Sequence, residues 1–326
     1  MKYSLLALAL AACCCAAFPS EASAPVPADS RILPVTVSRP QIKCISDVVY
    51  EQVPVRGFEN KAMTMDLLVP QTEAPMPAVV FITGGGFINA NKDSYIQERM
   101  RLAEEGYVTA SIEYRVAPAA SFPAPLEDVK AAVRYLRAHA AQYRIDPARI
   151  AVWGGSAGGY LAAMAGTTNG TRQFDRGDNL DQSSDVQAVV DLYGVSDLTS
   201  IGADYSPEVQ ALHRTSGATE ALWLKGSPVF TGKAGGVQDY PAEAAAANPL
   251  TYISDATPPF LLMHGDADTV VSPSQTDILH KALRAKGIDS TRCVVPGAVH
   301  GGAYWVQPEV LDFIVAFLNA HLKTEK

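Results

Sequence analysis

Residues 149–164 read RIAVWGGSAGGYLAAM, which joins a short apolar run, a glycine-rich turn with one serine, and an alanine-rich segment. The apolar run, residues 150–153, has the composition of a strand that is buried on both faces. The residues from Tyr160 onward are good helix formers. The stretch therefore predicts a strand, a tight turn that carries Ser156, and a helix.

Gly154 and Gly158 flank Ser156 at the two positions of a G-x-S-x-G nucleophile elbow. A serine on so sharp a turn has a strained backbone, and a Cβ at either flanking position would collide with the strand or the helix. The alternative interpretation is a glycine-rich loop with an incidental serine. Because a strand pattern precedes the turn and a helix pattern follows it, we predict that Ser156 is a nucleophile.

The rest of the chain alternates between strand patterns and helix patterns. Of the 326 residues 48% are hydrophobic and 18% are charged, which indicates a folded globular chain. Strands that alternate with helices of ordinary length predict an α/β fold, with a mainly parallel sheet of about eight strands and helices on both faces. The expected strands cover residues 48–53, 63–69, 78–82, 107–114, 150–153, 186–193, 260–263 and 291–295. The expected helices cover 94–105, 126–143, a segment that begins with 160–164, 274–286 and 309–322.

Residues 197–249, after the sixth expected strand, do not follow this alternation. The segment places Tyr205, Trp223, Phe230 and Tyr240 among small and polar residues and has no strand periodicity. A structureless loop of this length is unusual in a compact domain unless it is functional. We predict an insertion that shapes or covers the site, with a plain surface excursion as the alternative. Whether it moves as a lid stays open.

The N-terminus has the pattern of a targeting segment. Lys2 precedes an apolar run, residues 5–12, that is too short to span a bilayer. Residues 22–24, Ala-Ser-Ala, fit a signal-peptide cleavage site, whereas residues 10–13, Leu-Ala-Ala-Cys, resemble a lipoprotein box that would lipidate Cys13. We predict a signal peptide over 1–24, a flexible tether over 25–47 and a catalytic domain over 48–326. The protein is then exported, periplasmic or extracellular, and attached to a membrane only if Cys13 is lipidated.

Cysteine content and net charge narrow the set of partners. Outside the leader the chain has two cysteines, Cys44 and Cys293. Export permits a disulfide between them, whereas the strand pattern around Cys293 favours a buried thiol. The pairing therefore stays open. The chain has no C-x-x-C or H-E-x-x-H spacing, and we predict neither a metal site nor a cofactor. A net charge of −8 without a basic stripe argues against a nucleic-acid partner.

A serine nucleophile needs a base, and after a G-x-S-x-G elbow the base follows the acid along the chain. Five histidines follow the serine: His213, His264, His280, His300 and His321. Two of them fall in helix patterns, one in the insertion, and His264 precedes the acid candidates. His300 lies in a glycine-rich loop between the last strand and the last helix, so we predict that His300 is the base.

The acid should follow the strand before this histidine. Asp266 and Asp268 both do, and Asp197, at the end of the preceding strand, is a third candidate. Asp266 comes directly after a glycine, where an aspartate usually shapes the turn through bonds to the backbone. The spacing of these residues in the sequence favours Asp268 over Asp266 and Asp197 as the acid, but only slightly.

The oxyanion of a tetrahedral intermediate needs backbone N–H donors. Ala157, the residue after the nucleophile, is placed to supply one. The others should come from the loop of three glycines and a phenylalanine at residues 84–87, where the absence of side chains lets amides face the substrate. The alternative, a plain turn, leaves three consecutive glycines unexplained.

Together these segments resemble the α/β-hydrolase superfamily, and within it the carboxylesterase branch related to hormone-sensitive lipase and to bacterial acetyl-xylan and feruloyl esterases. The similarity runs from about residue 48 to the C-terminus and is most specific in PLEDVKAAVRYLRAHAAQYRIDPARIAVWGGSAGG, residues 125–159. In HGDADTVV, residues 264–271, the family's acid matches Asp268, and in VHGG, residues 299–302, its base matches His300. The resemblance, rather than the spacing, selects Asp268.

The chain departs from the family pattern in the glycine loop, where Thr83 stands in place of the usual histidine of His-Gly-Gly-Gly. In the family that histidine organises the loop and does not donate to the oxyanion. The resemblance therefore implies that Gly85, Gly86 and Ala157 form the oxyanion hole. The substitution leaves the rigidity of the loop in question.

These observations predict a serine carboxylesterase with a Ser156, His300 and Asp268 triad that acts on short-chain esters of small molecules or carbohydrates, with acetyl or feruloyl esters of polysaccharide as the family's example. One alternative is a serine peptidase of the prolyl-peptidase type, although those enzymes carry a large N-terminal domain for which the segment before residue 48 is too short. A second is a binding protein with this fold and no catalysis, although such proteins usually lack one triad member. The acyl group, the alcohol and the oligomeric state stay open.

Overall fold

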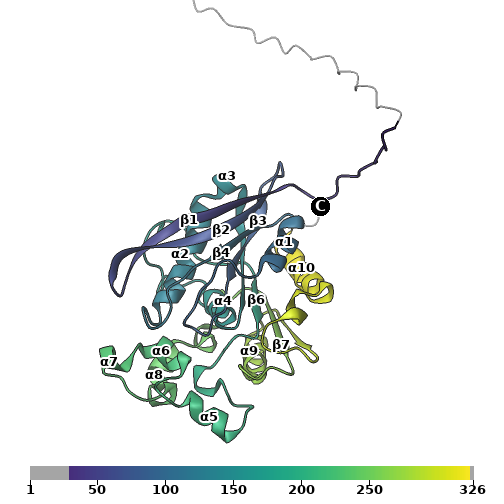
Figure 1. The fold of residues 1–326 in the computed structure, drawn as a ribbon. Coiled ribbons are helices and arrows are strands. Elements are labelled where there is room, and N and C mark those ends of the chain that lie inside the picture. The colour runs from purple at the N-terminus through teal and green to yellow at the C-terminus, as the bar shows by residue number, and fades with distance from the viewer. Residues whose placement is uncertain (1–28, 324–326) are drawn as a thin grey trace, which may run out of the picture. The chain divides into compact units, whose positions relative to one another are not determined.

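The computed structural model describes residues 29–323 (Figure 1). The chain divides into Met1–Ser38, of which 29–38 are described and contain no helix or strand, and one compact unit, Arg39–Lys326. The predicted signal peptide, with Cys13, lies outside the described residues. Among the described helices, none is both long enough and apolar enough to cross a membrane.

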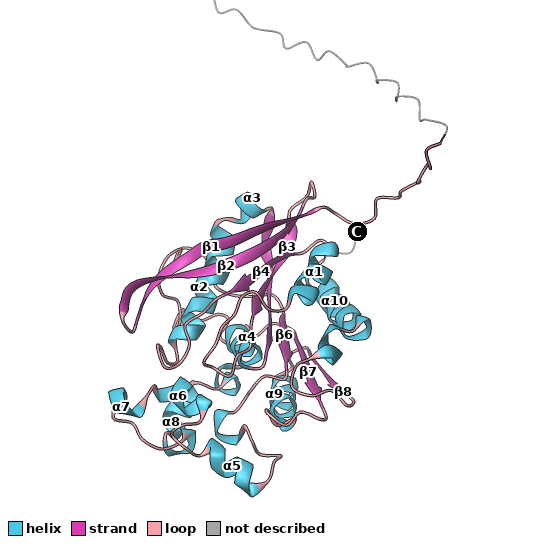
Figure 2. Cartoon of the chain, in the orientation of Figure 1, coloured by secondary structure: helices cyan, strands magenta, loops and turns pink. Residues whose placement is uncertain are grey.

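An eight-stranded sheet forms the centre of the compact unit (Figure 2). The strand order is β1-β2-β4-β3-β5-β6-β7-β8; β1 pairs antiparallel with β2 and β2 with β4, and all other pairs are parallel. The strands are β1 Ile42–Val55, β2 Phe58–Pro70, β3 Met76–Ile82, β4 Val108–Ile112, β5 Ile145–Gly155, β6 Val189–Leu192, β7 Phe260–Gly265 and β8 Ser290–Val295. The predicted α/β fold, with a mainly parallel sheet of eight strands, is confirmed.

The parallel register places the carboxyl ends of the central strands at one edge of the sheet. Gly155 at the end of β5 pairs with Leu192 at the end of β6, and Leu192 pairs with Met263 in β7. The residues that follow β5, β6 and β7 therefore emerge side by side. In open α/β sheets this edge is where ligands bind.

Helices cover both faces of the sheet, because side chains along each central strand alternate between two apolar clusters. Val80 packs into one cluster with α2, α4 and α9, and Val79 packs into the other with α1 and α10. The covering helices are α1 Ile96–Glu104, α2 Ala124–Ala138, α4 Ala157–Thr167, α9 Ser274–Ala285 and α10 Pro308–Leu322. Both layers are visible in Figure 1.

Several element boundaries differ from the sequence expectation: β2 begins at Phe58 rather than at residue 63, and β5 begins at Ile145 rather than at residue 150. The hairpin begins at Ile42 rather than at residue 48, because β1 is an edge strand with many exposed side chains and a weak apolar alternation. The helix expected over 126–143 is interrupted at His139, whose φ of −104° and ψ of 21° are not helical, and a short α3, Ala140–Tyr143, follows.

The segment after β6 has more regular structure than its sequence indicates. It contains α5 Pro207–His213, α6 Thr219–Lys225, α7 Pro228–Thr231 and α8 Pro241–Ala246, with 3₁₀ turns η1 Leu198–Ser200, η2 Val237–Asp239 and η3 Pro249–Tyr252. These helices are too short for an amphipathic period to be recognised. Trp223 of α6 is fully buried, so the insertion packs onto the domain as an ordered layer.

Cys44 and Cys293 are both free thiols. Cys44 lies in β1 and Cys293 in β8, the first and last strands of the sheet order. A disulfide requires the two Cα atoms to lie within about 7 Å. The full width of the sheet separates the two residues. Cys44 and Cys293 therefore do not form a disulfide.

Candidate active site

Ser156 lies between β5 and α4 with a φ of 57° and a ψ of −123°, a conformation that a residue with a side chain rarely adopts. The flanking glycines make this turn sterically feasible. A Cβ on Gly154 would lie 2.0 Å from the carbonyl oxygen of Gly158, and one on Gly158 would lie 1.9 Å from the carbonyl oxygen of Ile82. The geometry is that of a nucleophile elbow, and Ser156 remains partly exposed at the edge of the sheet.

His300 connects Ser156 to Asp268. Its Nε2 lies 2.8 Å from Oγ of Ser156, and its Nδ1 lies 2.7 Å from Oδ2 of Asp268. The side chain of His300 is 17% exposed and that of Asp268 is fully buried, so the hydrogen-bonded series runs from the protein interior toward solvent. The structure thus brings together three residues that the sequence analysis singled out from distant segments.

Asp268 is held by its own loop and by two imidazoles. Its Oδ1 accepts the amide protons of Val270 and Val271 at 2.8 and 3.1 Å. Burial raises the pKa of Asp268, but hydrogen bonds from His264 and His300, the charge of His300 and the Val270 amide outweigh burial and hold that pKa well below its usual range. Asp268 is therefore an anion at any physiological pH, as the partner of an imidazolium must be.

His264 is a member of this site that the sequence analysis did not select. It is fully buried at the end of β7, and its Nε2 lies 3.2 Å from Oδ2 of Asp268 and 3.0 Å from the carbonyl oxygen of Val271. Its Nδ1 lies 3.2 Å from Oγ1 of Thr276. The sequence feature that could have identified His264 is its position four residues before Asp268, with a tight turn between the two.

The other acid candidates have structural partners. Oδ1 of Asp266 accepts the amide of Gly297 at 2.6 Å, and Oδ1 of Asp197 accepts the amide of Thr199 and the side-chain amide of Asn248, each at 3.0 Å. Asp266 thus joins two loops and Asp197 begins η1.

The other histidines that follow the serine pair elsewhere. His213 bonds Glu220, and His280 bonds Ser290. His321 lies 3.6 Å from Asp289. Among the described residues, no group of three or more His, Cys, Asp or Glu side chains could hold a metal ion.

The glycine loop lies against the elbow. A Cβ on Gly84 would lie 2.7 Å from the carbonyl oxygen of Gly155 and 3.1 Å from Cβ of Ser156, so a side chain here would displace the backbone of the elbow. Gly86 has a φ of 58°, which favours glycine. Within the described part of the chain, the amides of Gly85, Gly86 and Ala157 have no hydrogen-bond acceptor, so all three are free to bind a ligand.

The insertion and a buried tyrosine support this loop. Phe87 packs against Trp223 of the insertion with ring centroids 4.7 Å apart and against Tyr160 of α4 at 5.6 Å. The hydroxyl of Tyr114 donates to the carbonyl oxygen of Thr83 at 2.6 Å. Thr83 fills the position of the family's histidine, and its buried Oγ1 has no partner among the described residues. The backbone contact and the aromatic cluster, rather than the Thr83 side chain, hold the loop.

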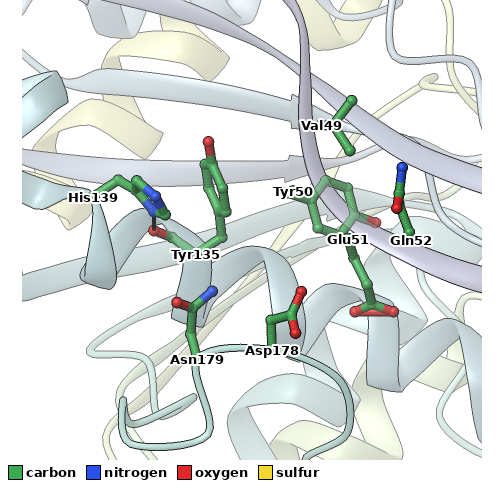
Figure 3. A pocket seen from close by; sticks show the side chains of 8 residues that line it. All are labelled: Val49, Tyr50, Glu51, Gln52, Tyr135, His139, Asp178 and Asn179. Atoms are coloured by element: carbon green, nitrogen blue, oxygen red, sulfur yellow. Dashed lines mark hydrogen bonds between the residues drawn. The ribbon is translucent and has the colours of Figure 1, made fainter.

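A cavity of about 500 Å³ lies away from these residues, between β1 and the end of α2 (Figure 3). Tyr50 and Glu51 line it from the strand, and the stacked rings of Tyr135 and His139 line it from the helix side, with centroids 4.0 Å apart. Neither the serine of the elbow nor its partners line this cavity. It is therefore separate from the candidate active site.

The strand order, the serine on its elbow and the histidine loop after the last strand define an α/β-hydrolase, and the resemblance to the esterases of this superfamily is confirmed. The chain belongs to the BD-FAE family, whose family model matches residues 65–283. It is 32% identical over 231 residues to the esterase LipC of Mycobacterium tuberculosis, an alignment that covers 70% of this chain and 53% of LipC. The chain thus spans about half the length of this curated relative.

Two solved structures are similar over most of the chain. A truncated carbohydrate esterase from gut microbiota superposes with a TM-score of 0.74 and 26% identity, covering 89% of this chain and 99% of that one. A bifunctional GH43-CE protein of Bacteroides eggerthii superposes with a TM-score of 0.72 and 31% identity, covering 85% of this chain and 38% of that one. Both similarities extend well beyond the elbow motif.

Proposed function

We propose that this protein is a serine carboxylesterase that hydrolyses short-chain esters, with acetyl or feruloyl esters of polysaccharide as its substrate class. The single observation that carries the proposal is the position of His300, within hydrogen-bond distance of both Ser156 and Asp268. The similarity to the esterase LipC, to the carbohydrate esterase from gut microbiota and to the GH43-CE protein supports the same reaction class.

In the acylation step, Nε2 of His300 takes the proton of Ser156 as Oγ attacks the ester carbonyl carbon. The ionised Asp268 stabilises the resulting imidazolium and fixes the tautomer of His300. The imidazolium then gives its proton to the alcohol oxygen, the bond between that oxygen and the acyl carbon breaks, and the alcohol leaves. An acyl-enzyme on Ser156 remains.

In the second step water replaces the alcohol. His300 takes a proton from the water, hydroxide adds to the acyl carbon, and the acid leaves as Ser156 regains its proton. Both steps pass through a tetrahedral oxyanion. The unpaired amides of Gly85, Gly86 and Ala157 would bind it, and each such donor contributes about 3 kcal/mol to transition-state stabilisation.

The substrate class rests on the relatives and on the predicted export. A carbohydrate esterase and a GH43-CE protein are among the solved neighbours, so an acyl group on a sugar is a consistent substrate. An exported enzyme, periplasmic or extracellular, would meet polysaccharide esters that do not enter the cytoplasm. A lipidated Cys13 would attach it to a membrane.

The proposal is tested by turnover of 4-nitrophenyl acetate and by labelling with a fluorophosphonate. Wild type and the control Ser46→Ala, changed at an exposed serine of β1, should be active and labelled. Ser156→Ala should be inactive and unlabelled, and His300→Ala should lose most turnover. Labelling of Ser156→Ala equal to wild type would overturn the assignment, and absence of labelling in wild type would favour a binding protein. Faster cleavage of a dipeptide anilide than of the ester would favour a peptidase.

A further inference from the structure

The cavity of about 500 Å³ between β1 and the end of α2 falls within the range of about 300–1,000 Å³ that is usual for small-molecule sites. No residue of the triad or of the glycine loop lines it. Its lining includes two carboxyl groups and three aromatic rings, those of Glu51, Asp178, Tyr50, Tyr135 and His139 (Figure 3). A ligand bound here would be separate from the ester on Ser156.

The carboxyl of Glu51 is buried in the wall of this cavity without a partner. The residue is 5% exposed, and its Oε2 has no hydrogen-bond partner among the described residues. Figure 3 shows the carboxyl directed away from β1, toward the loop that carries Asp178, and a Cβ on Gly177 of that loop would lie 3.3 Å from Oε2. A buried carboxyl without a partner is costly, and a hydrogen-bond donor bound in the cavity would supply one.

The positive charges near Glu51 are engaged by other groups. The guanidinium of Arg115 bonds Asp128 at 2.6 Å, and that of Arg134 lies 3.2 Å from Asp175. Burial, and then the charge of Asp128, raises the pKa of Glu51 to about 8, although both arginines oppose this. No lysine or arginine of the described chain lines the cavity, so a cation for Glu51 has to come from a ligand.

The rings around the carboxyl suit a cationic ligand. Nδ1 of His139 lies 2.9 Å from the carbonyl oxygen of Tyr135, which can only accept, so Nδ1 carries the proton and Nε2 of the neutral ring is an acceptor. The hydroxyl of Tyr50 donates to the carbonyl oxygen of Glu113 at 2.6 Å, which leaves its ring for the ligand. Aromatic rings attract a cation within about 6 Å of their centroids.

We propose that this cavity binds a small organic ammonium ion, which donates hydrogen bonds to the carboxylate of Glu51 and lies beside the aromatic rings. Among the residues that the structure describes, no group of three or more His, Cys, Asp or Glu side chains could hold a metal ion, which favours an ammonium over a metal cation. A neutral alcohol would leave the charge of the carboxylate uncompensated. Because the ammonium favours the ionised carboxyl, its binding at neutral pH displaces the proton of Glu51.

Glu51 loses this proton among other charged and titratable groups. These lie on α2 and its C-terminal end, directly after β4, and on the loop that carries Asp178: Glu127, Asp128, Arg134, His139, Glu113, Arg115, Asp175, Arg176 and Asp178. All of them remain in Glu51→Gln. That variant therefore isolates the contribution of Glu51.

Isothermal titration calorimetry of the full chain tests the inference, with cyclohexylammonium as the cation and cyclohexanol as a neutral probe of the same shape. At pH 9 wild type should bind cyclohexanol at least about tenfold more weakly than cyclohexylammonium, the effect of removing a hydrogen bond between charged groups. Glu51→Gln should weaken binding of the ammonium by about tenfold or more. Asp178→Asn, at an exposed position, should weaken it by about two- to fivefold. Glu59→Gln, at an exposed position of β2, is the matched control and should bind as wild type does.

The dependence of binding on pH gives a second readout. The wild-type Kd for cyclohexylammonium should fall about tenfold between pH 7 and pH 9, because a carboxyl with a pKa of about 8 must first be ionised at the lower pH. Titrations at pH 7 in two buffers of different ionisation enthalpy should show release of about one proton for each ammonium bound. Glu51→Gln should release none.

Three results would overturn the inference: equal affinity of wild type for the two probes, no binding of the ammonium at either pH, or wild-type affinity in Glu51→Gln. Turnover of 4-nitrophenyl acetate by Glu51→Gln should equal that of wild type, because no catalytic residue lines the cavity, and this turnover shows that the variant is folded. The inference does not rest on the proposed function. Absence of esterase turnover in a protein that binds the ammonium would overturn the esterase and leave this site.

Discussion

Nε2 of His264 lies 3.2 Å from Oδ2 of Asp268, the same carboxylate oxygen that binds His300. The carbonyl oxygen of Val271, 3.0 Å from the same nitrogen, can only accept, so the proton of His264 must be on Nε2. On the other side of the ring, Nδ1 lies 3.2 Å from Oγ1 of Thr276. His264 thus acts as a fixed donor that orients Asp268 from inside the fold.

We predict that His264→Leu lowers kcat for 4-nitrophenyl acetate by about 10- to 100-fold, the equivalent of the 1.5–3 kcal/mol that a hydrogen bond to a charged group contributes. KM should change little, because His264 acts through Asp268 and not on the substrate. His264→Gln, which retains an N–H donor, should recover part of the loss. Steady-state kinetics on variants with wild-type circular dichroism provide the measurement, and wild-type kcat in His264→Leu would contradict the prediction.

Gly158→Ala should both unfold the elbow and inactivate the protein. The new Cβ would lie 1.9 Å from the carbonyl oxygen of Ile82, so β3 and α4 would have to separate. We expect a loss of more than about 2 kcal/mol in the free energy of unfolding, as for other overpacked cores. Gly217→Ala is the control, because its nearest neighbouring atom lies 4.0 Å away. Urea melts compare the two, and equal stability would refute the steric argument.

The elbow was predictable because its determinants are local. The strand pattern, the two glycines and Ser156 lie within a few residues, and each excludes alternatives on steric grounds. His300 was predictable by elimination, since the other histidines after the serine fall in helix patterns, in the insertion or before the acid. The parallel sheet followed from the same kind of local pattern, repeated along the chain.

The contacts of Asp268 with His300 and with His264 could not be derived from the spacing of these residues in the sequence. Only one residue lies between Asp266 and Asp268 in the sequence. Their roles differ because the side chain of Asp266 accepts a hydrogen bond from Gly297 in a distant loop. In the sequence, nothing distinguishes His264 from other residues at the end of a buried strand. Its role depends on the turn after β7, which places Asp268 beside it. Contacts between loops determine both roles, and a single sequence does not encode them in any short pattern.

Because Glu51 is buried, we expect the free energy of unfolding to depend on pH, and this effect is independent of catalysis. Burial, and then the charge of Asp128, raises its pKa from 4.5 to about 8, and its Oε2 has no partner among the described residues (Figure 3). The folded state therefore holds the proton more tightly than the unfolded state does. Wild type should lose stability as the pH rises from about 4.5 to 8, because the folded state must then bury a charge.

Glu51→Gln removes that cost. Its free energy of unfolding should exceed that of wild type by about 1–3 kcal/mol at pH 9, and the difference should vanish near pH 5. Urea melts at pH 5, 7 and 9 measure it. The control is Glu59→Gln at an exposed position of β2, which should show no such trend. A gain that is the same at all three pH values would show that Glu51 does not titrate as argued.

The glycine loop is held through its backbone, because Thr83 stands where the family has a histidine and its side chain makes no hydrogen bond among the described residues. The hydroxyl of Tyr114 donates to the carbonyl oxygen of Thr83 at 2.6 Å, whereas the hydroxyl of Thr83 is buried and unpaired among the described residues. Tyr114→Phe removes the contact that fixes the backbone, and it leaves the buried carbonyl without this donor.

We therefore expect Tyr114→Phe to lower kcat for 4-nitrophenyl acetate and to cost about 1–3 kcal/mol of stability, the penalty for leaving a buried acceptor unpaired. Thr83→Val has nearly the same shape as the native residue and removes only an unsatisfied hydroxyl, so it should retain wild-type kcat with equal or higher stability. If Thr83→Val were instead the slower variant, the threonine hydroxyl would have to hold the loop through a partner that forms only with substrate bound. Kinetics and thermal melts of the two variants side by side decide between a loop fixed by its backbone and one fixed by its side chain.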